Sequence, residues 1–353
     1  MQELGVDLLL VTPSADLRYL IGYNAIPLER LTALVIAPHA EPFLIVPKLE
    51  VSTAKASPFG GLGWKVIGWS ESENPYELIG SRSGFTHGRI AVDNHMWAER
   101  VLTITEKFPE SNIELAAPII NAIRVVKTPA ELDHLRVAAA AIDRVHAQVP
   151  NLLRVGRTEK EVGRDIADLI LAEGHTRVDF VIVASGPNGA SPHHELSSRV
   201  IQMGDPVVVD IGGTMPSGYC SDCTRTYSMG DPGGDYLERY AALQVAQELS
   251  TQAVSHGAIS HDIDAAGRNS LAEHGLNEYF IHRTGHGIGL ETHEEPYIGE
   301  NNSTVIENNM VFSIEPGFYI EGVHGARIED IVICTPSGPE SINKQTRDLV
   351  VVQ

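Results

Sequence analysis

The first third of the chain alternates short apolar runs with amphipathic stretches. Apolar runs bounded by turn residues are typical of buried strands, and apolar residues at helical spacing are typical of helices packed on a sheet. The runs predict strands at residues 6–11, 31–37, 43–46, 66–69 and 90–92. The amphipathic stretches predict helices at residues 49–56, 75–80 and 97–108. An N-terminal α/β domain is therefore expected.

Two capping boxes mark the start of a different region. Thr128 is followed by Pro129 and Glu131, so a helix is expected to begin here and to run to about residue 153. Thr158 and Glu161 form the second capping box, and they predict a helix to about residue 172. We place the domain boundary just before the first box, near Ala122. The expected domains are residues 1–122 and 123–353.

Composition excludes several classes of function. The 353 residues include 46 acids and 26 bases, and the net charge of −20 disfavours nucleic acid or an anionic membrane as a partner. Three cysteines are too few for a disulfide framework and suit a reducing compartment. No apolar run approaches the roughly 18 residues of a membrane span, and the first residues lack a signal-peptide pattern. A soluble cytoplasmic protein is expected.

The last 230 or so residues contain a faint internal repeat with an offset of about 100 positions. His193 corresponds to His293, and each is followed by an acid two residues before a glycine, Asp210 and Glu315. A second acid, Asp222 in one half and Glu329 in the other, follows a glycine four positions earlier in each case. Chance similarity is the alternative. If the repeat is real, it predicts two halves that pack about a pseudo-two-fold axis, with the acids of both halves converging on that axis.

Asp210 ends an apolar run at 207–209, so it is expected at the end of a core strand. On an antiparallel hairpin, Asp210 and Asp222 would lie on neighbouring strands and point the same way. Two such buried carboxylates repel each other, and a cation between them removes the repulsion.

The Cys220-x-x-Cys223 pair around Asp222 suggests a zinc or redox site at first. In a strand, residues three apart point to opposite faces, so the two thiols cannot hold one ion together. Redox pairs of this spacing also usually lie at a helix N-terminus, for which there is no signal here. We expect Cys220 near the site of Asp222 and Cys223 in ordinary packing.

Histidines and further acids extend the cluster. His282, His286 and His293 fall within twelve positions and are interleaved with glycines, which allow close backbone approach. Glu315 ends another apolar run. Glu329 is expected inside a strand at 327–333, on the same face as Arg327.

Four carboxylates and one imidazole carry a formal charge near −4, which two divalent ions would balance. The candidate ligands are Asp210, Asp222, His286, Glu315 and Glu329. Oxygen-rich ligation suits Mn, Co or Fe, with Zn possible, and paired ions about 3.5–4 Å apart are a recurrent hydrolytic site.

The motifs around these residues resemble the creatinase/aminopeptidase P/prolidase superfamily, whose catalytic domain has the pita-bread metallopeptidase fold. The resemblance rests on Val209–Gly212, Gly218–Thr226, His282–Leu290, Val311–Gly317 and Arg327–Asp330, together with Ala15–Tyr23 near the N-terminus. It covers essentially the whole chain and is strongest to short bacterial Xaa-Pro dipeptidases. It implies a mixed α/β protein, with a creatinase-like N-terminal domain and a pseudo-two-fold pita-bread domain. It also implies a homodimer.

The resemblance implies a role for each site residue. Asp210 would chelate one metal, His286 and Glu315 the other, and Asp222 and Glu329 would bridge both. His193 and His293 would stabilise charge on the oxygen of the scissile carbonyl. Glu315 would also move a proton from water to the leaving nitrogen. His282 and Arg327 would support the metal ligands or belong to the substrate pocket.

The sequence departs from the family pattern at three points. The spacing from Asp210 to Asp222 is twelve, one residue longer than usual, so the intervening turn is expected to bulge. Tyr297 stands where many prolidases carry the arginine that binds the dipeptide carboxylate. The chain also begins almost at its first strand, without the helix that precedes it in the family, so we expect a trimmed or misassigned start.

The implied function is hydrolysis of the bond before proline by a dinuclear metallopeptidase acting on Xaa-Pro dipeptides. Tyr297 keeps open an aminopeptidase P type activity on longer Xaa-Pro peptides. A non-catalytic binding protein on this fold is disfavoured because no ligand is missing. A metal-free creatinase-like hydrolase would lack these carboxylates, and a methionine aminopeptidase usually lacks the N-terminal domain.

Overall fold

The computed structural model describes all residues, 1–353, and the chain forms two compact units. The N-terminal unit is Met1–Arg124 and the C-terminal unit is Val125–Gln353. The division falls two residues after Ala122, where the boundary was expected.

The N-terminal unit is built on a six-stranded mixed sheet in the order β4-β3-β2-β1-β5-β6. All five predicted strands are confirmed, and β6 was not predicted because its four residues lie at the sheet edge and include only two apolar side chains. The strands are β1 (Leu8–Val11), β2 (Ala33–Ile36), β3 (Phe43–Pro47), β4 (Lys65–Trp69), β5 (Arg89–Val92) and β6 (Asn112–Leu115).

Both faces of this sheet are covered by helices. Successive residues of β1 alternate between two cores: Leu8 and Leu10 belong to one, and Leu9 and Val11 belong to the other. The first core includes residues of α3 (Pro75–Ser83) and α4 (Ala98–Lys107), and the second includes residues of α1 (Ala15–Ile21), α2 (Val51–Ala56) and α5 (Ala117–Arg124).

The helix predictions for this unit are partly wrong. The helix expected at 49–56 begins as a 3-10 turn, Lys48–Glu50, and becomes α-helical only from Val51. Helices α1 and α5 were not predicted, because seven and eight residues are too few for a clear helical period. Short 3-10 turns also occur at Gln2–Leu4 and Pro58–Leu62.

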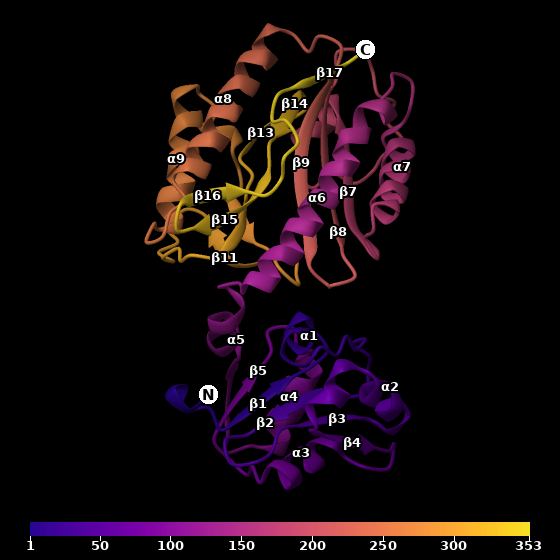
Figure 1. Cartoon of the computed structure of the whole chain (residues 1–353), viewed down its shortest axis with the longest axis vertical. Helices are drawn as coiled ribbons and strands as arrows, with labels where there is room; N and C mark the ends of the chain where they lie inside the picture. Colours follow the sequence, from indigo (N-terminus) through magenta and orange to yellow (C-terminus); the bar gives the residue numbers. More distant parts are fainter. The chain divides into compact units, whose positions relative to one another are not determined.

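The C-terminal unit begins with the two predicted capped helices, which are confirmed. They are α6 (Pro129–Leu152) and α7 (Glu159–Ala172), and both capping boxes are complete. The second half repeats this order with α8 (Gly234–Gln252) and α9 (Ser260–Glu273), and α9 has the same length as α7. Figure 1 shows α8 and α9 side by side on one side of this unit's strands, with α6 and α7 on the other.

The strands of this unit form three sheets. The first has the order β17-β9-β8-β7, the second β11-β10-β12-β15-β16, and β13 pairs with β14 alone. The bounds are β7 (Arg177–Ser185), β8 (Pro206–Thr214), β9 (Cys220–Met229), β10 (Gly285–Gly287), β11 (Glu294–Ile298), β12 (Val311–Ile314), β13 (Gly317–Ile320), β14 (His324–Arg327), β15 (Asp330–Thr335), β16 (Gly338–Ser341) and β17 (Val350–Val352), with 3-10 turns at Gly186–Ala190 (η4) and Asn277–Tyr279 (η5).

The β8–β9 hairpin has a regular register. Asp210 pairs with Thr224 and Asp222 pairs with Gly212, so the two aspartates lie diagonally on one face, as predicted. The ladder contains no bulge, and any extra residue is confined to the five-residue turn 215–219. Cys220 and Cys223 are buried in different cores and form no disulfide, which confirms that they face opposite ways.

The single strand expected at 327–333 is a wrong prediction. The chain leaves its pairing with β13 after Arg327 and joins β12 only from Asp330. Between the two ladders, the amide of Glu329 donates to the carbonyl of Thr224 at 3.2 Å. Glu329 lies in this break, and its carboxylate contacts Thr224 on the hairpin.

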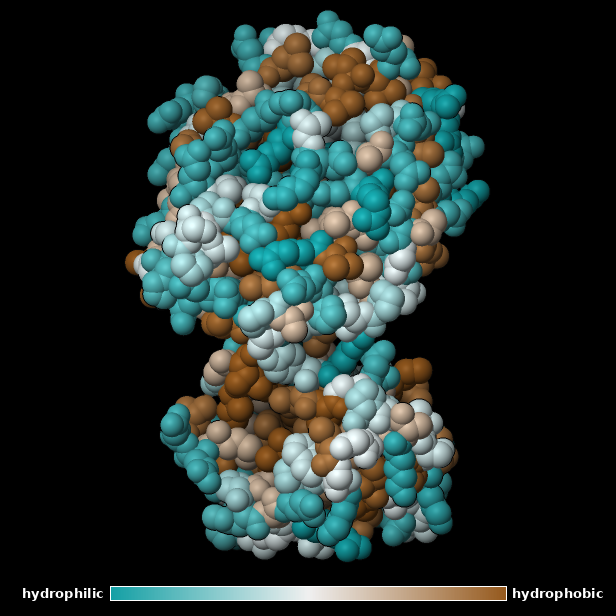
Figure 2. Space-filling view, in the orientation of Figure 1, coloured by the Kyte–Doolittle hydropathy of each residue, from teal (hydrophilic) through white to brown (hydrophobic).

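No helix combines the length and the apolar character needed to cross a membrane. Hydrophilic residues cover most of the C-terminal unit on the face drawn in Figure 2, in keeping with the net charge of −20.

Candidate metal centre

Five side chains from separate strands converge inside the C-terminal unit. Asp210 lies on β8, Asp222 on β9 and His286 on β10, while Glu315 directly follows β12 and Glu329 lies between β14 and β15. Their ligand atoms fall into three overlapping groups, one of which also includes His293, and within each group all atoms lie within 4.8 Å of one another. The structure therefore brings together all five residues that the sequence selected.

His286 is oriented by the backbone. Its Nδ1 lies 3.1 Å from the carbonyl oxygen of Gly287 and donates there, which directs Nε2 toward the carboxylates. Nε2 lies 3.1 Å from Glu315 Oε1 and 3.6 Å from Asp222 Oδ2. An imidazole nitrogen directed at several carboxylate oxygens is an arrangement that suits a divalent metal, which would bind the neutral ring.

Two carboxylates each have one oxygen held by the protein and one without a partner. Asp210 Oδ2 accepts from Arg327 Nη2 at 2.5 Å, and Glu329 Oε2 accepts from Thr224 Oγ1 at 2.7 Å. The other oxygens, Asp210 Oδ1 and Glu329 Oε1, are buried and have no hydrogen-bond partner. Because an unpaired buried carboxylate oxygen is costly, these atoms fit bound cations.

The electrostatics of the cluster also fit cations. Burial, followed by the charges of Glu329 and Asp210, raises the pKa of Asp222 well above its usual range. Burial and the nearby charges of Glu315 and Asp210 do the same to the pKa of Glu329. Burial acts in the same direction on Glu315, but the hydrogen bond and charge of His286 outweigh it and lower the pKa. Divalent ions would hold all these carboxylates in the ionised form.

Two residues that support the cluster were not predicted from the sequence, although the two-residue period of a strand could have identified them. Thr224 is two residues after Asp222 on the same face of β9, and its hydroxyl donates to Glu329. Ser313 is two residues before Glu315, donates to Glu315 Oε1 at 2.9 Å and accepts from the amide of His286 at 2.9 Å. Both residues position carboxylate or imidazole side chains of the cluster.

A chain of contacts links the cluster to its surroundings through Arg327. Its Nη1 donates to the hydroxyl of Tyr319 at 2.8 Å, and that hydroxyl lies 2.8 Å from His282 Nε2. Burial raises the pKa of Tyr319 to about 12, which keeps the hydroxyl protonated. His282 and Arg327 thus lie next to the ligands, and Tyr319, which no sequence pattern indicated, joins them.

The two remaining histidines lie at the exposed edge of the cluster. The His293 ring is tilted against the His286 ring, with centroids 4.0 Å apart. Burial, followed by the charge of His286, lowers the pKa of His293 to about 4, so its imidazole is neutral at pH 7. His193 is exposed on the loop after η4, and its charge contributes, after burial, to the lowered pKa of both His282 and His293.

Tyr297 lines a cavity of about 600 Å³ together with His282 and Arg283. The guanidinium carbon of Arg283 lies 4.1 Å from the centroid of the Tyr297 ring. Arg283 forms no salt bridge, and its charge is one of the secondary causes, after burial, of the lowered pKa of His293. An unpaired cation therefore lies close to the cluster, beside the position at which the family's arginine is replaced.

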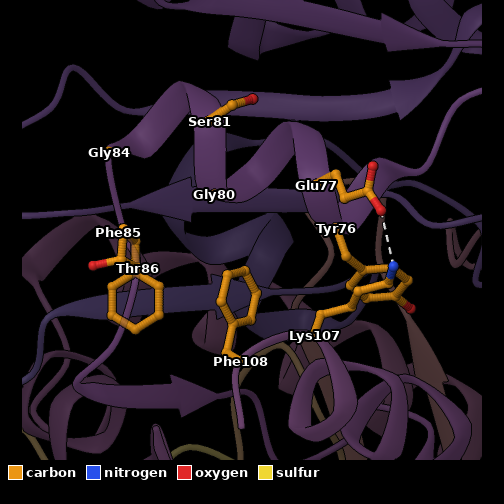
Figure 3. Close-up of a pocket in the computed structure, with 9 residues that line it drawn as sticks. All are labelled: Tyr76, Glu77, Gly80, Ser81, Gly84, Phe85, Thr86, Lys107 and Phe108. Atoms are coloured by element: carbon orange, nitrogen blue, oxygen red, sulfur yellow. Dashed lines mark hydrogen bonds and ion pairs between the residues drawn. The ribbon is translucent and has the colours of Figure 1, made fainter. Parts of the chain in front are cut away.

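A second cavity, of about 490 Å³, lies in the N-terminal unit (Figure 3). Its only carboxylate, Glu77, is paired with Lys107 at 2.9 Å. The rings of Phe85 and Phe108 meet edge to face at 5.3 Å and form its apolar wall. With its one carboxylate paired, this cavity has no group of metal ligands like that of the C-terminal unit.

Comparison with known proteins agrees with this geometry. Residues 133–336 match metallopeptidase family M24, and residues 1–126 match the creatinase/prolidase N-terminal domain. The chain belongs to metallopeptidase family M24, within the creatinase/prolidase superfamily of pita-bread hydrolases.

The similarity to individual members extends over the whole chain. "Probable dipeptidase PepE" of Mycobacterium tuberculosis is 48% identical over 350 residues, which are 99% of this chain and 93% of that protein. The Xaa-Pro dipeptidase of Lactobacillus delbrueckii subsp. lactis is 35% identical over 359 residues, which are 100% of this chain and 96% of that protein. The crystal structure of dipeptidase PepE from Mycobacterium ulcerans superposes with a TM-score of 0.95 at 48% identity, over 99% of this chain and 94% of that one.

Proposed function

We propose that this protein is a dinuclear-metal Xaa-Pro dipeptidase that hydrolyses the peptide bond before proline. The observation that carries the proposal is the convergence of four carboxylates and one correctly oriented imidazole, with two buried carboxylate oxygens left unpartnered. The similarity to a relative named Xaa-Pro dipeptidase supports the same substrate class.

The metal ligands in this proposal are Asp210, Asp222, His286, Glu315 and Glu329. Two divalent ions held there would supply Lewis acidity for a substrate carbonyl and would activate a water molecule for attack. Oxygen-rich ligation favours Mn among the candidates, with Co, Fe or Zn as alternatives.

The other side chains have roles that follow from their protonation. The neutral imidazole of His293 can donate a hydrogen bond to the oxygen of the scissile carbonyl as charge builds on it, and His193 would act beside it. Glu315 Oε1 already contacts Ser313 and His286, whereas Oε2 has only a 3.9 Å ion pair with Arg327, so Oε2 is the atom that would carry a proton to the leaving nitrogen.

Arg283 favours a dipeptide over a longer peptide. The free carboxylate of a dipeptide lies one residue beyond the scissile bond and would need a cation close to the metal cluster. Arg283 meets this need, because it is unpaired and lines the adjacent cavity with Tyr297 and His282. An aminopeptidase P type activity on longer peptides is the second candidate, favoured by the tyrosine at position 297.

The test is hydrolysis of Xaa-Pro dipeptides and of Xaa-Pro-Xaa tripeptides by the purified protein loaded with Mn²⁺, with the EDTA-treated protein as the control. Release of proline from the dipeptides is expected. Cleavage of the tripeptides alone would establish the second candidate, and no cleavage of either would refute both.

Two further features are proposed. All three cysteines are unpaired, which suits a reducing cytoplasmic location. A homodimer, which the resemblance implies, stays a prediction that sedimentation of the purified protein would test.

A further inference from the structure

We infer that Glu159 is a positioning residue that holds the loop carrying His193 against the metal centre. The inference rests on the proposed function, in which His193 lies beside the scissile carbonyl. Glu159 is the first residue of α7 and is fully buried. It is not needed to cap this helix, because Glu161 completes the capping box with Thr158.

The carboxylate of Glu159 collects donors from both ends of the loop 186–197. Oε1 accepts from the amide and the hydroxyl of Ser185, at 2.8 and 2.7 Å, and from Asn188 Nδ2 at 3.0 Å. Oε2 accepts from His194 Nε2 at 2.8 Å and from Ser197 Oγ at 2.6 Å. A buried charge with this many partners is a rigid attachment point, since the loss of the acceptor would leave several buried donors unpaired.

The residues on both sides of His193 are therefore held. His194 is bonded to Glu159, and the carbonyl of Pro192 accepts from Arg327 Nη1 at 3.3 Å. Arg327 is itself bonded to Asp210 in the metal cluster. The side chain of His193 is exposed, so its position is set by these attachments of the two neighbouring residues rather than by packing of its own ring.

The start of the loop also packs tightly on β14. A Cβ added to Gly325 would lie 2.1 Å from the carbonyl oxygen of Gly189, so the turn η4 and the strand touch through their backbones. The loop is thus fixed at η4 by contact, at Pro192 by Arg327 and at three further residues by Glu159. The attachment to Glu159 can be removed by one side-chain substitution, without changing a metal ligand or Arg327, which is bonded to one.

A double-mutant cycle between Glu159→Gln and His193→Ala tests the inference in the Mn²⁺-loaded enzyme with an Xaa-Pro dipeptide. Glu159→Gln should lower kcat by roughly tenfold, with KM and metal content nearly unchanged. In the His193→Ala background the same substitution should lower kcat by less than about twofold, because the residue on which it acts is already gone. Equal factors in the two backgrounds, or loss of metal from Glu159→Gln, would overturn the inference.

Two variants keep the test decisive. Glu161→Gln is the matched control: it removes the charge of an exposed acid in the same helix turn but keeps the acceptor of the capping box, so kcat and thermal stability should both stay nearly unchanged. If Glu159→Gln does not fold, Ser197→Ala removes one donor to the same carboxylate and should show the same coupling to His193 with a smaller effect. Absence of turnover by the unmodified enzyme would refute the proposed function, and this inference with it. Turnover with an additive cycle would refute the inference alone.

Discussion

Replacing Asp222 by asparagine should stabilise the metal-free protein while destroying its metal site. The ligand atoms of Asp210, Asp222 and Glu329 lie within 4.8 Å of one another. At that distance two unit charges repel by about 3.5 kcal/mol at an effective dielectric constant of about 20. Apart from the 3.6 Å approach of His286 Nε2, no hydrogen bond holds the Asp222 carboxylate, so little is lost with it.

The sign of the pH dependence follows from the raised pKa of Asp222. Above about pH 4, where an ordinary aspartate ionises, the folded state binds more protons at this position than the unfolded state, so stability falls as pH rises. Protonation of the cluster relieves part of the repulsion. We therefore expect Asp222→Asn to add about 2 kcal/mol at pH 8 and close to nothing at pH 4.

Differential scanning calorimetry in EDTA at the two pH values measures the effect. All three tryptophans, Trp64, Trp69 and Trp97, lie in the N-terminal unit, so tryptophan fluorescence provides an internal control whose transition should not move. With Mn²⁺ the order should reverse, because the unmodified protein gains binding free energy that the variant has lost.

Asp264→Asn is the control variant, because Asp264 is a buried acid whose carboxylate oxygens all have hydrogen-bond partners. Asp264 accepts from Arg268 and from the amide and hydroxyl of Thr284, so its replacement should destabilise by roughly 3–5 kcal/mol at both pH values. Asp222→Asn could also destabilise the metal-free protein in the same way. That result would show that repulsion between the carboxylates does not destabilise the folded state, and the metal assignment would lose its electrostatic basis.

Three further outcomes are expected. His293→Ala should lower kcat by about 100-fold with metal content unchanged, whereas His286→Ala should lose metal in elemental analysis; loss of metal from both would show His293 to be a ligand. Tyr319→Phe removes the hydroxyl between Arg327 and His282 and should lower thermal stability by about 1 kcal/mol without releasing metal; an unchanged melting temperature would contradict this role. Arg283→Ala should raise KM for an Xaa-Pro dipeptide about tenfold, or about 1.4 kcal/mol, but leave KM for the Xaa-Pro amide unchanged; equal effects on both would exclude carboxylate binding.

Local rules were sufficient for much of the fold and for the ligand set. The capping boxes at Thr128 and Thr158 gave the starts of α6 and α7, because a cap depends only on residues within one turn. The two-residue period of a strand placed Asp222 and Cys220 on one face and Cys223 on the other. The same period would have identified Thr224 and Ser313, had it been applied to them.

Only the tertiary structure decided how these local pieces meet. Glu329 contacts Thr224 from a break between two ladders, and nothing in residues 327–333 marks that break. Glu159 has the sequence context of a solvated helix-start acid, yet its partners lie 26 to 38 residues further along the chain. Periodicity and capping act over a few residues, so the sequence by itself determined the local elements and the candidate ligands. Burial and hydrogen-bond partners arise from packing between distant segments, so only the tertiary structure decided which residues those side chains contact.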